Sequence, residues 1–225
     1  MVALYVAAAR LSGPSDWRPV SGDRLQAGRT DRAPGAALRL AQNGPGRPLS
    51  PAAQDPTVNI APARAADADA LLALRNHYIA HSFATFDEAP LAPAAVRDWM
   101  AGFADRGPYR LLVARAGDRL VGWCSSQAYR AHPAFSRTIE TSVYVAPDAA
   151  GSGVGSALYE RLFDDLAGLG LHRAVVGIAL PNEPSVRLHA RFGFRTVGVF
   201  EEYAHKNGRA ISSQWMQRAM DGGAA

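Results

Sequence analysis

Three alternating glycines stand between a β-branched segment and an amphipathic segment, and this feature constrains the fold more than any other. Residues 139–145 read as a strand, and Gly151, Gly153 and Gly155 open a helix that runs to about Leu169. Glycine permits a tight turn and lets the backbone approach a ligand closely. The N–H groups at the start of a helix bind anions, and a diphosphate is the ligand that we expect here. The sequence therefore predicts a phosphate-binding turn.

Hydrophobic periodicity predicts the remaining elements. Apolar residues with helical spacing follow Asp67, which stands at an N-cap position. The Asn207-Gly208 pair predicts a hairpin near the C-terminus. The order of strands and helices indicates one α/β domain with a mixed sheet over residues 57–220. Strands are expected at 58–61, 109–114, 120–128, 174–180, 195–205 and 210–216, and helices after Asp67 to Ile79, at 93–103 and at 184–192.

Residues 1–56 differ in composition from the rest of the chain. They are rich in Ala, Arg, Gly and Pro, and they hold seven arginines and four aspartates without a sustained period. We expect this segment to be a disordered N-terminal extension, either genuine or the product of an upstream start codon. A nucleic-acid module would gather basic and aromatic side chains on a folded surface, so we expect no nucleic-acid partner.

The residue counts exclude several classes of protein. The only cysteine, Cys124, precludes an intrachain disulfide and indicates a reducing, cytoplasmic compartment. No apolar run approaches the roughly 20 residues that cross a bilayer, so no membrane partner is expected. The only lysine, Lys206, lies outside any Walker A pattern. Only His77 and His81 have a metal-like spacing, and without the H-E-x-x-H pattern we expect no metal.

The glycine turn has two other readings. A dinucleotide site requires glycine or alanine where Ser156 stands and an acidic residue near Leu171 and His172, and both are missing. A turn that binds no ligand remains possible, although alternating glycines at a helix start cost up to about 1 kcal/mol each relative to alanine.

The glycine turn Gly151–Leu158 follows the strand Thr138–Val145 and is itself followed by the block Pro181–His189. Together with several shorter stretches, this pattern resembles the GNAT superfamily of N-acetyltransferases, and more closely its phosphinothricin and methionine sulfone acetyltransferase group. The resemblance implies an acyl-CoA N-acyltransferase fold, with a mostly antiparallel mixed sheet, a splayed parallel pair and helices on both faces. It also implies acetyl-CoA as cosubstrate and a homodimer. The matching stretches are Arg75–Tyr78, Gly122–Ser125, Thr138–Val145, Gly151–Leu158, Pro181–His189, Arg191–Phe194 and Lys206–Arg209.

The resemblance also implies the residues that bind the coenzyme. The main chain of Val143, Tyr144 and Val145 is expected to bind the pantetheine amides and to stabilise the oxyanion. The diphosphate is assigned to Gly151, Ser152, Gly153, Val154, Gly155 and Ser156, with further contacts from Asn182 and Ser185. Ala150 departs from the Arg or Gln that usually precedes the first glycine, so one side-chain contact to phosphate is lost.

Glu140 is the main catalytic candidate because it lies within an apolar, β-branched strand where an unpaired carboxylate is costly. A carboxyl whose pKa is raised by burial can accept the proton that a substrate ammonium must lose. The alternative is a structural salt bridge to Arg130 or Arg137.

Four further residues each have two interpretations. His189 could protonate the leaving thiolate or could be structural. Asn182 could contact the coenzyme or only cap a helix. Arg130 could bind an acidic group of the substrate or remain solvated, and Phe86 could line the substrate pocket or belong to the core.

The hypothesis is direct acetyl transfer to the amine of a small amino-acid-like substrate. One alternative is an acceptor such as a protein N-terminus, a polyamine or an aminoglycoside, for which an acidic groove would be expected. Another is a domain that binds acyl-CoA without catalysis, an interpretation that Ala150 favours and Glu140 opposes.

Overall fold

The computed structural model describes residues 58–220, and the predicted extension over residues 1–56 lies outside this range. The eleven principal elements follow the predicted order of strands and helices. They are β1 (Val58–Pro62), α1 (Ala68–His81), α2 (Pro93–Met100), β2 (Arg110–Ala116), β3 (Arg119–Ala128), β4 (Thr138–Val145), α3 (Val154–Leu166), β5 (Arg173–Ala179), α4 (Glu183–Arg191), β6 (Arg195–Lys206) and β7 (Arg209–Ala219).

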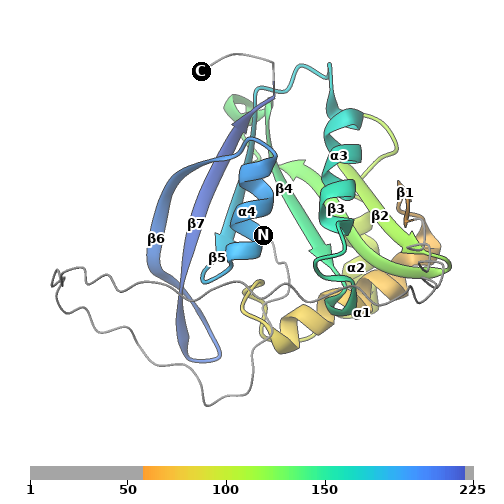
Figure 1. Ribbon diagram of the computed structural model, residues 1–225, viewed down its shortest axis with the longest axis horizontal. Helices are drawn as coiled ribbons and strands as arrows, with labels where there is room; N and C mark the ends of the chain where they lie inside the picture. The colour runs from red at the N-terminus through yellow and green to blue at the C-terminus, as the bar shows by residue number, and fades with distance from the viewer. Residues whose placement is uncertain (1–57, 221–225) are drawn as a thin grey trace, which may run out of the picture. The chain divides into compact units, whose positions relative to one another are not determined.

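One seven-stranded sheet organises the described chain, with the strand order β1-β2-β3-β4-β5-β7-β6. Every neighbouring pair is antiparallel except β4 and β5, so the expected mixed sheet is confirmed. The parallel ladder covers only three residue pairs, from Thr138↔Arg173 to Glu140↔Val175. Beyond Glu140 the two strands diverge, as Figure 1 shows.

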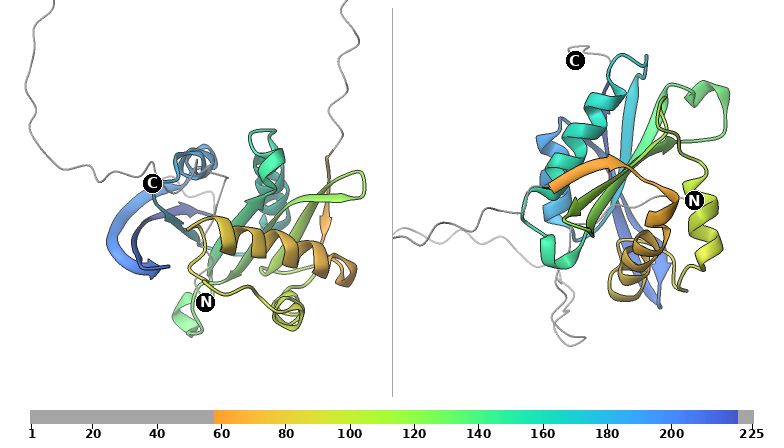
Figure 2. Two further views of the ribbon diagram at one scale, coloured as in Figure 1. Left: turned by 90° about the horizontal axis from the view of Figure 1, so that it is seen from below. Right: turned by 90° about the vertical axis from the view of Figure 1, so that its right-hand side faces the viewer.

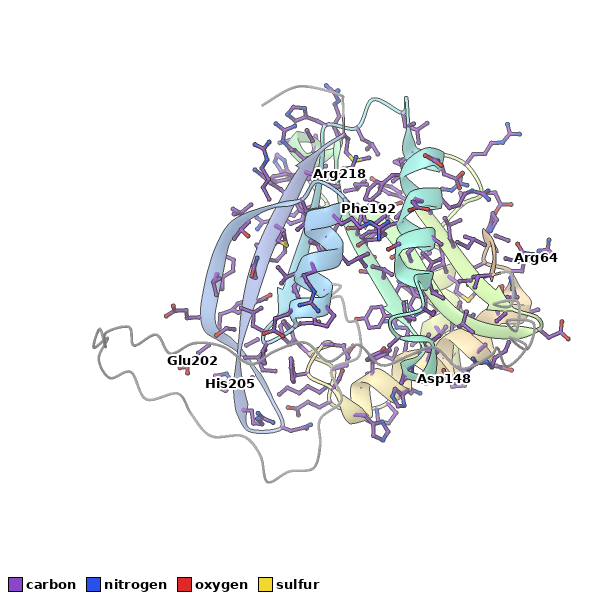
Figure 3. The ribbon with its side chains drawn as sticks, viewed as in Figure 1. Arg64, Asp148, Phe192, Glu202, His205 and Arg218 are labelled. Atoms are coloured by element: carbon purple, nitrogen blue, oxygen red, sulfur yellow. The ribbon has the colours of Figure 1, made fainter. Side chains whose placement is uncertain are left out.

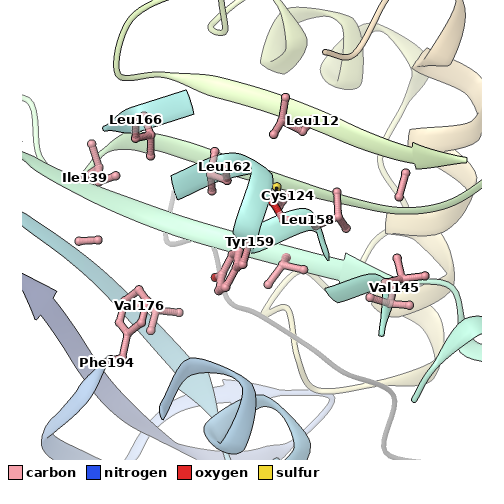
Figure 4. Close-up of a cluster of buried hydrophobic side chains, with 14 of the residues drawn as sticks. Leu112, Cys124, Ile139, Val145, Leu158, Tyr159, Leu162, Leu166, Val176 and Phe194 are labelled. Atoms are coloured by element: carbon pink, nitrogen blue, oxygen red, sulfur yellow. Dashed lines mark hydrogen bonds between the residues drawn. The ribbon is translucent and has the colours of Figure 1, made fainter. Parts of the chain in front are cut away.

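Helices cover both faces of the sheet. Figure 2 shows α3 and α4 on one face and α2 on the other. The α3 stripe of Leu158, Leu162 and Leu166 is fully or almost fully buried in a cluster with strand side chains such as Ile139, and Figure 4 shows part of this cluster. The expectation that Leu169 belongs to the same stripe is wrong, because the helix ends at Leu166 and Leu169 is 44% exposed.

The opposite face packs against α1 and α2. Leu71 and Tyr78 of α1 and Val96 of α2 join Trp123 and Tyr144 in a second buried cluster. A helix face buried in this way satisfies the apolar periodicity that the sequence shows.

Two expected details at helix ends differ from the structure. Phe103 lies beyond the end of α2 at Met100, although its ring still meets Trp99 edge-on at 5.1 Å. Asp67 occupies the N-cap position of α1, but its carboxylate accepts hydrogen bonds from the Arg64 N–H and the Arg115 guanidinium instead of from the helix. The Arg64 N–H bonds one carboxylate oxygen and the charged Arg115 side chain bonds the other, so both oxygens already have partners.

Candidate active site

The glycine turn leaves backbone donors at the start of α3. Gly151 and Gly153 have φ angles of 82° and 89°, which only glycine adopts without strain. The Ala157 N–H bonds the Gly153 carbonyl at 3.0 Å. The N–H groups of Val154, Gly155 and Ser156 precede that bond, so they belong to the first turn and have no partner from the regular helical pattern. These donors fit an anion.

Ser152 differs from its neighbours in this turn. Its N–H and its hydroxyl both donate to the Ala149 carbonyl, at 3.3 and 2.7 Å. Its amide therefore closes the turn internally. On the other side of the turn, Nη1 of the exposed Arg191 lies 3.4 Å from the Ser156 hydroxyl and brings a positive charge close to these donors.

The main chain of β4 offers a second set of unpaired groups. The Thr138 carbonyl accepts from Tyr129, just after β3, and the Ala146 N–H donates to Val121 of β3. The even-numbered residues of β4 therefore direct their main-chain groups towards β3. By alternation, the main chains of Thr141, Val143 and Val145 face the diverging β5. The Val145 carbonyl already accepts from the Tyr78 hydroxyl at 2.5 Å. Val143 therefore offers both of its groups and Val145 its N–H, whereas the main chain of Tyr144 faces β3.

Glu140 lies at the last pairing of β4 with β5 and is 3% exposed. Its Oε1 is buried and makes no hydrogen bond within the part of the chain that the structure describes. Burial raises the pKa of its carboxyl to about 7. The salt-bridge alternative gains no support, because Arg130 and Arg137 are exposed. Arg130 lies over the Tyr129 ring, and Arg137 donates to the Gly170 carbonyl.

His189 is completely buried, and its two ring nitrogens bind different elements. Nδ1 lies 2.8 Å from the Ser185 carbonyl and Nε2 lies 2.8 Å from the Tyr159 hydroxyl, which is itself 3.2 Å from the Thr141 hydroxyl. Because a carbonyl only accepts, Nδ1 must carry the proton of the neutral ring. Burial lowers the pKa of His189 to about 4. The geometry favours the structural interpretation, in which His189 ties α4 to α3 and β4.

The aromatic side chains around His189 strengthen this tie. Tyr159 contacts the rings of Phe163, Phe192 and Phe194. Figure 3 shows Phe192 between α4 and α3. The predicted role of His189 as a general acid would need a donor directed at the leaving group, and its Nδ1 proton is held by a carbonyl.

Asn182 and Ser185 begin α4 and are both buried. The Asn182 side chain accepts a hydrogen bond from the Ser185 N–H at 3.2 Å, so the N-cap interpretation is confirmed. Contact with the coenzyme stays a prediction for both residues.

Phe86 and Arg130 lie in different surroundings. Phe86 is half-buried against Ala179 and Ile211, at the ends of β5 and β7, and meets Tyr203 edge-on at 5.9 Å. Arg130 is exposed at the end of β3, where it also lies over the Phe135 ring at 5.6 Å. The structure thus places Phe86 in a small apolar cluster and leaves Arg130 accessible.

Lys206 is a structurally important residue that the sequence reasoning missed. Its Nζ donates to the carbonyls of Ile79, Ser82 and Thr85 at 2.8, 2.7 and 2.9 Å. These bonds join the β6–β7 hairpin to the segment that carries Phe86. The available signal was that Lys206 is the only lysine among many arginines.

Comparison with known proteins identifies the family. The profile of the acetyltransferase (GNAT) family matches residues 71–194. The chain belongs to this family. It is an acetyltransferase with the fold that the sequence resemblance implied.

Two named relatives and one solved structure illustrate the similarity. A phosphinothricin N-acetyltransferase of Streptomyces coelicolor is 46% identical, over 72% of this chain and 96% of its own. An L-methionine sulfoximine/L-methionine sulfone acetyltransferase of Pseudomonas paraeruginosa is 31% identical, over 73% of this chain and 96% of its own. A putative acetyltransferase of Salmonella typhimurium, solved with its cofactor acetyl-CoA, is 30% identical with a TM-score of 0.68, over 75% of this chain and 96% of its own.

The described residues also bear on metal binding and on membrane crossing. Within 58–220, no three His, Cys, Asp or Glu side chains are grouped to hold a metal. None of the helices in this range is long and apolar enough to span a bilayer.

Proposed function

We propose that the protein transfers the acetyl group of acetyl-CoA to the primary amine of a small amino-acid-like molecule, such as phosphinothricin, methionine sulfone or methionine sulfoximine. The observation that carries this proposal is the placement of Glu140, a buried carboxyl of raised pKa at the point where β4 and β5 separate. The names of the relatives support this substrate class.

The residues at both ends of the separated strands fit the coenzyme. The first-turn N–H groups of Val154, Gly155 and Ser156 suit its diphosphate. The Val143 carbonyl and the Val145 N–H suit the pantetheine amides, which would bind as a neighbouring strand does. When bound, the coenzyme supplies a thioester carbonyl that an amine can attack.

These positions support direct transfer. Glu140 accepts a proton from the substrate ammonium, directly or through water. The amine nitrogen then bonds to the acetyl carbon as the carbon–sulfur bond breaks. The second proton that the nitrogen loses passes to the departing thiolate, directly or through water, so the coenzyme leaves as the thiol. The Val143 N–H is the better donor to the developing oxyanion, because the main chain of Tyr144 is directed to β3.

An acidic groove raises the alternative of a cationic acceptor. It measures about 730 Å³ and is lined by Leu180, Pro181, Glu183, Val199, Glu201, Glu202 and Ser212. However, Ser212 alternates with Ser213 along β7, so it faces away from the side of the sheet that carries Glu140. The groove therefore gives less support to a polyamine or protein N-terminus than Glu140 gives to a small amino acid.

Two further features complete the proposal. We place the protein in the cytoplasm, where the buried free thiol of Cys124 would stay reduced. We also propose a homodimer, because β6 is an edge strand with exposed apolar side chains at Val197, Val199, Phe200 and Tyr203.

The decisive experiment measures thiol release from acetyl-CoA across a panel of amino-acid analogues, polyamines and peptides, with Glu140→Gln in parallel. We expect turnover with amino-acid analogues and a loss of at least about 100-fold in the variant. Turnover with no amine would instead support a domain that only binds acyl-CoA. Full activity in Glu140→Gln would remove the assignment of the base.

A further inference from the structure

Buried polar atoms without partners concentrate on one side of the sheet. Six side-chain nitrogen or oxygen atoms among the described residues are buried without a hydrogen bond. Four of them belong to Glu140 and Ser142 of β4 and to Ser213 and Trp215 of β7. A buried donor left unpaired costs about 1–3 kcal/mol, so such a concentration calls for an occupant.

The strand register places these four side chains on the same face. Side chains alternate along each strand, so Glu140 and Ser142 share a face of β4, and Ser213 and Trp215 share a face of β7. Glu140 pairs with Val175 of β5, and Val175 shares its face with Gly177, the partner of Trp215. The same β5 strand thus connects Glu140 to both β7 residues.

The Trp215 ring confirms this placement. A Cβ atom built on Gly177 would lie only 3.1 Å from two carbons of the indole, so the ring rests on β5 at that glycine. The ring also meets Tyr129, which follows β3, with centroids 6.1 Å apart. Trp215 therefore lies on the Glu140 side, across the strand that borders the separation of β4 and β5.

We propose that Ser142, Ser213 and Trp215 bind the oxygen atoms of the acceptor's side-chain head group, a sulfone, sulfoximine or phosphinate. This inference rests on the proposed function and names the residues that select its substrate. The two hydroxyls and the indole N–H can all donate. These groups carry no charge, so their burial costs less free energy than the burial of a guanidinium. They suit a head group that has no charge or whose charge is spread over several oxygens.

The neighbouring side chains fit the remainder of such a substrate. Ile211 lies two residues before Ser213 on the same face of β7, in an apolar cluster with Ala179 and Phe86. A short methylene chain can contact this cluster while its amine lies near Glu140. The face thus combines an apolar patch, a group of donors and a base, as a small polar amino acid requires.

The test compares two acceptors that differ only in the oxygens. Methionine sulfone and methionine share one carbon skeleton, so the ratio of their kcat/KM values reports the recognition of the sulfone. We expect wild type to prefer the sulfone. Ser213→Ala and Trp215→Phe should each reduce kcat/KM for the sulfone about fivefold to tenfold and change that for methionine by less than about twofold.

Ser212→Ala is the matched control. Its hydroxyl accepts from the Glu202 N–H on the opposite side of β7, and we expect the substrate ratio to stay unchanged. Thermal melts and acetyl-CoA affinity should show that each variant is folded and binds the coenzyme.

Two results would overturn the inference while leaving the proposed function intact. One is an equal loss on both substrates in Ser213→Ala and Trp215→Phe, which would indicate a structural role. The other is an unchanged substrate ratio in both variants, which would assign the donors to ordered water. Failure of wild type to acetylate any amino acid would instead remove the proposed function, and this inference with it.

Discussion

Burial shifts the pKa values of the two titratable groups at the centre of the candidate site in opposite directions. It favours the uncharged form of each, so it raises the pKa of Glu140 to about 7 and lowers that of His189 to about 4. Near neutral pH, Glu140 gains and loses a proton readily while His189 remains neutral. The carboxyl is therefore suited to proton transfer, and the imidazole is suited to a fixed hydrogen-bond network.

Glu140 should give the enzyme a characteristic pH dependence. A base works only when deprotonated, so kcat/KM should rise about tenfold per pH unit below pH 7 and level off above it. Thiol release measured from pH 5 to 9 tests this limb. In Glu140→Gln the inflection near pH 7 should disappear, and its persistence would show that another group titrates.

Arg191 should supply the phosphate contact that Ala150 lacks. Its guanidinium lies beside Ser156, so Arg191→Ala should raise KM for acetyl-CoA about tenfold or more and leave kcat nearly unchanged, by the loss of a charged hydrogen bond. Arg187→Ala, one helical turn earlier and also exposed, is the control.

The acetyl donor itself provides a second check on Arg191. S-acetylpantetheine has no diphosphate, so the variant and wild type should use it equally. An equal loss with both donors would mean that Arg191 acts on the fold and not on the phosphates.

At the scale of elements, local patterns predicted the order of strands and helices because each element has its own periodicity and its own end signals. Gly151 and Gly153 marked the turn before α3, and Asn207-Gly208 marked the hairpin, where both residues have positive φ. The end of α3 was predicted too late. Leu169 continues the apolar spacing, but the helix ends at Leu166 and Ala167 is extended.

The contacts between distant strands could not be predicted in this way. Glu140 stood out because a carboxylate in an apolar strand is locally anomalous. Ser213 and Trp215 are ordinary strand residues in the sequence, and only the register of β5 with β7 brings them to the same face as Glu140. The sequence left both interpretations of His189 open, since the hydrogen bond that distinguishes them comes from Tyr159 on another helix.

The β6–β7 hairpin should hold the segment that carries Phe86 in position. Lys206→Met keeps most of the side-chain volume but leaves three carbonyls without their ammonium, so it should reduce the free energy of unfolding by about 3 kcal/mol. KM for the amino-acid substrate should rise, whereas KM for acetyl-CoA should not.

His205→Ala provides the comparison for Lys206→Met. His205 is exposed, and Figure 3 shows it on the outer side of the hairpin, so its removal should change stability by less than about 0.5 kcal/mol. Equal increases of both KM values in Lys206→Met would mean a general loss of structure.

At the scale of the whole molecule, the sheet formed by residues 58–220 has β6 as an edge strand, with no other strand of the described chain beyond it. Strand β6 is last in the strand order, and Val197, Val199 and Phe200 are 63%, 47% and 55% exposed. Edge strands with exposed apolar side chains tend to pair with another chain. Under a twofold axis, β6 of one copy would meet β6 of a second copy, so the same surface serves both partners.

In sedimentation velocity experiments we therefore expect wild type to be dimeric and the double variant Val199→Glu/Phe200→Glu to be monomeric. Leu169→Glu introduces a negative charge at an exposed apolar residue outside β6 and should leave the oligomeric state of wild type unchanged. A monomeric wild type at micromolar concentration would contradict the proposed homodimer.

The three-pair ladder between β4 and β5 has a consequence for the lifetime of the protein. A coenzyme seated between the separated strands would complete the sheet, so it would act as a removable part of the fold. Its contribution follows mass action, about 2.7 kcal/mol when its concentration is 100 times the dissociation constant. The amount of folded enzyme that survives proteolysis would then follow the supply of the coenzyme, free and acetylated, in the cell.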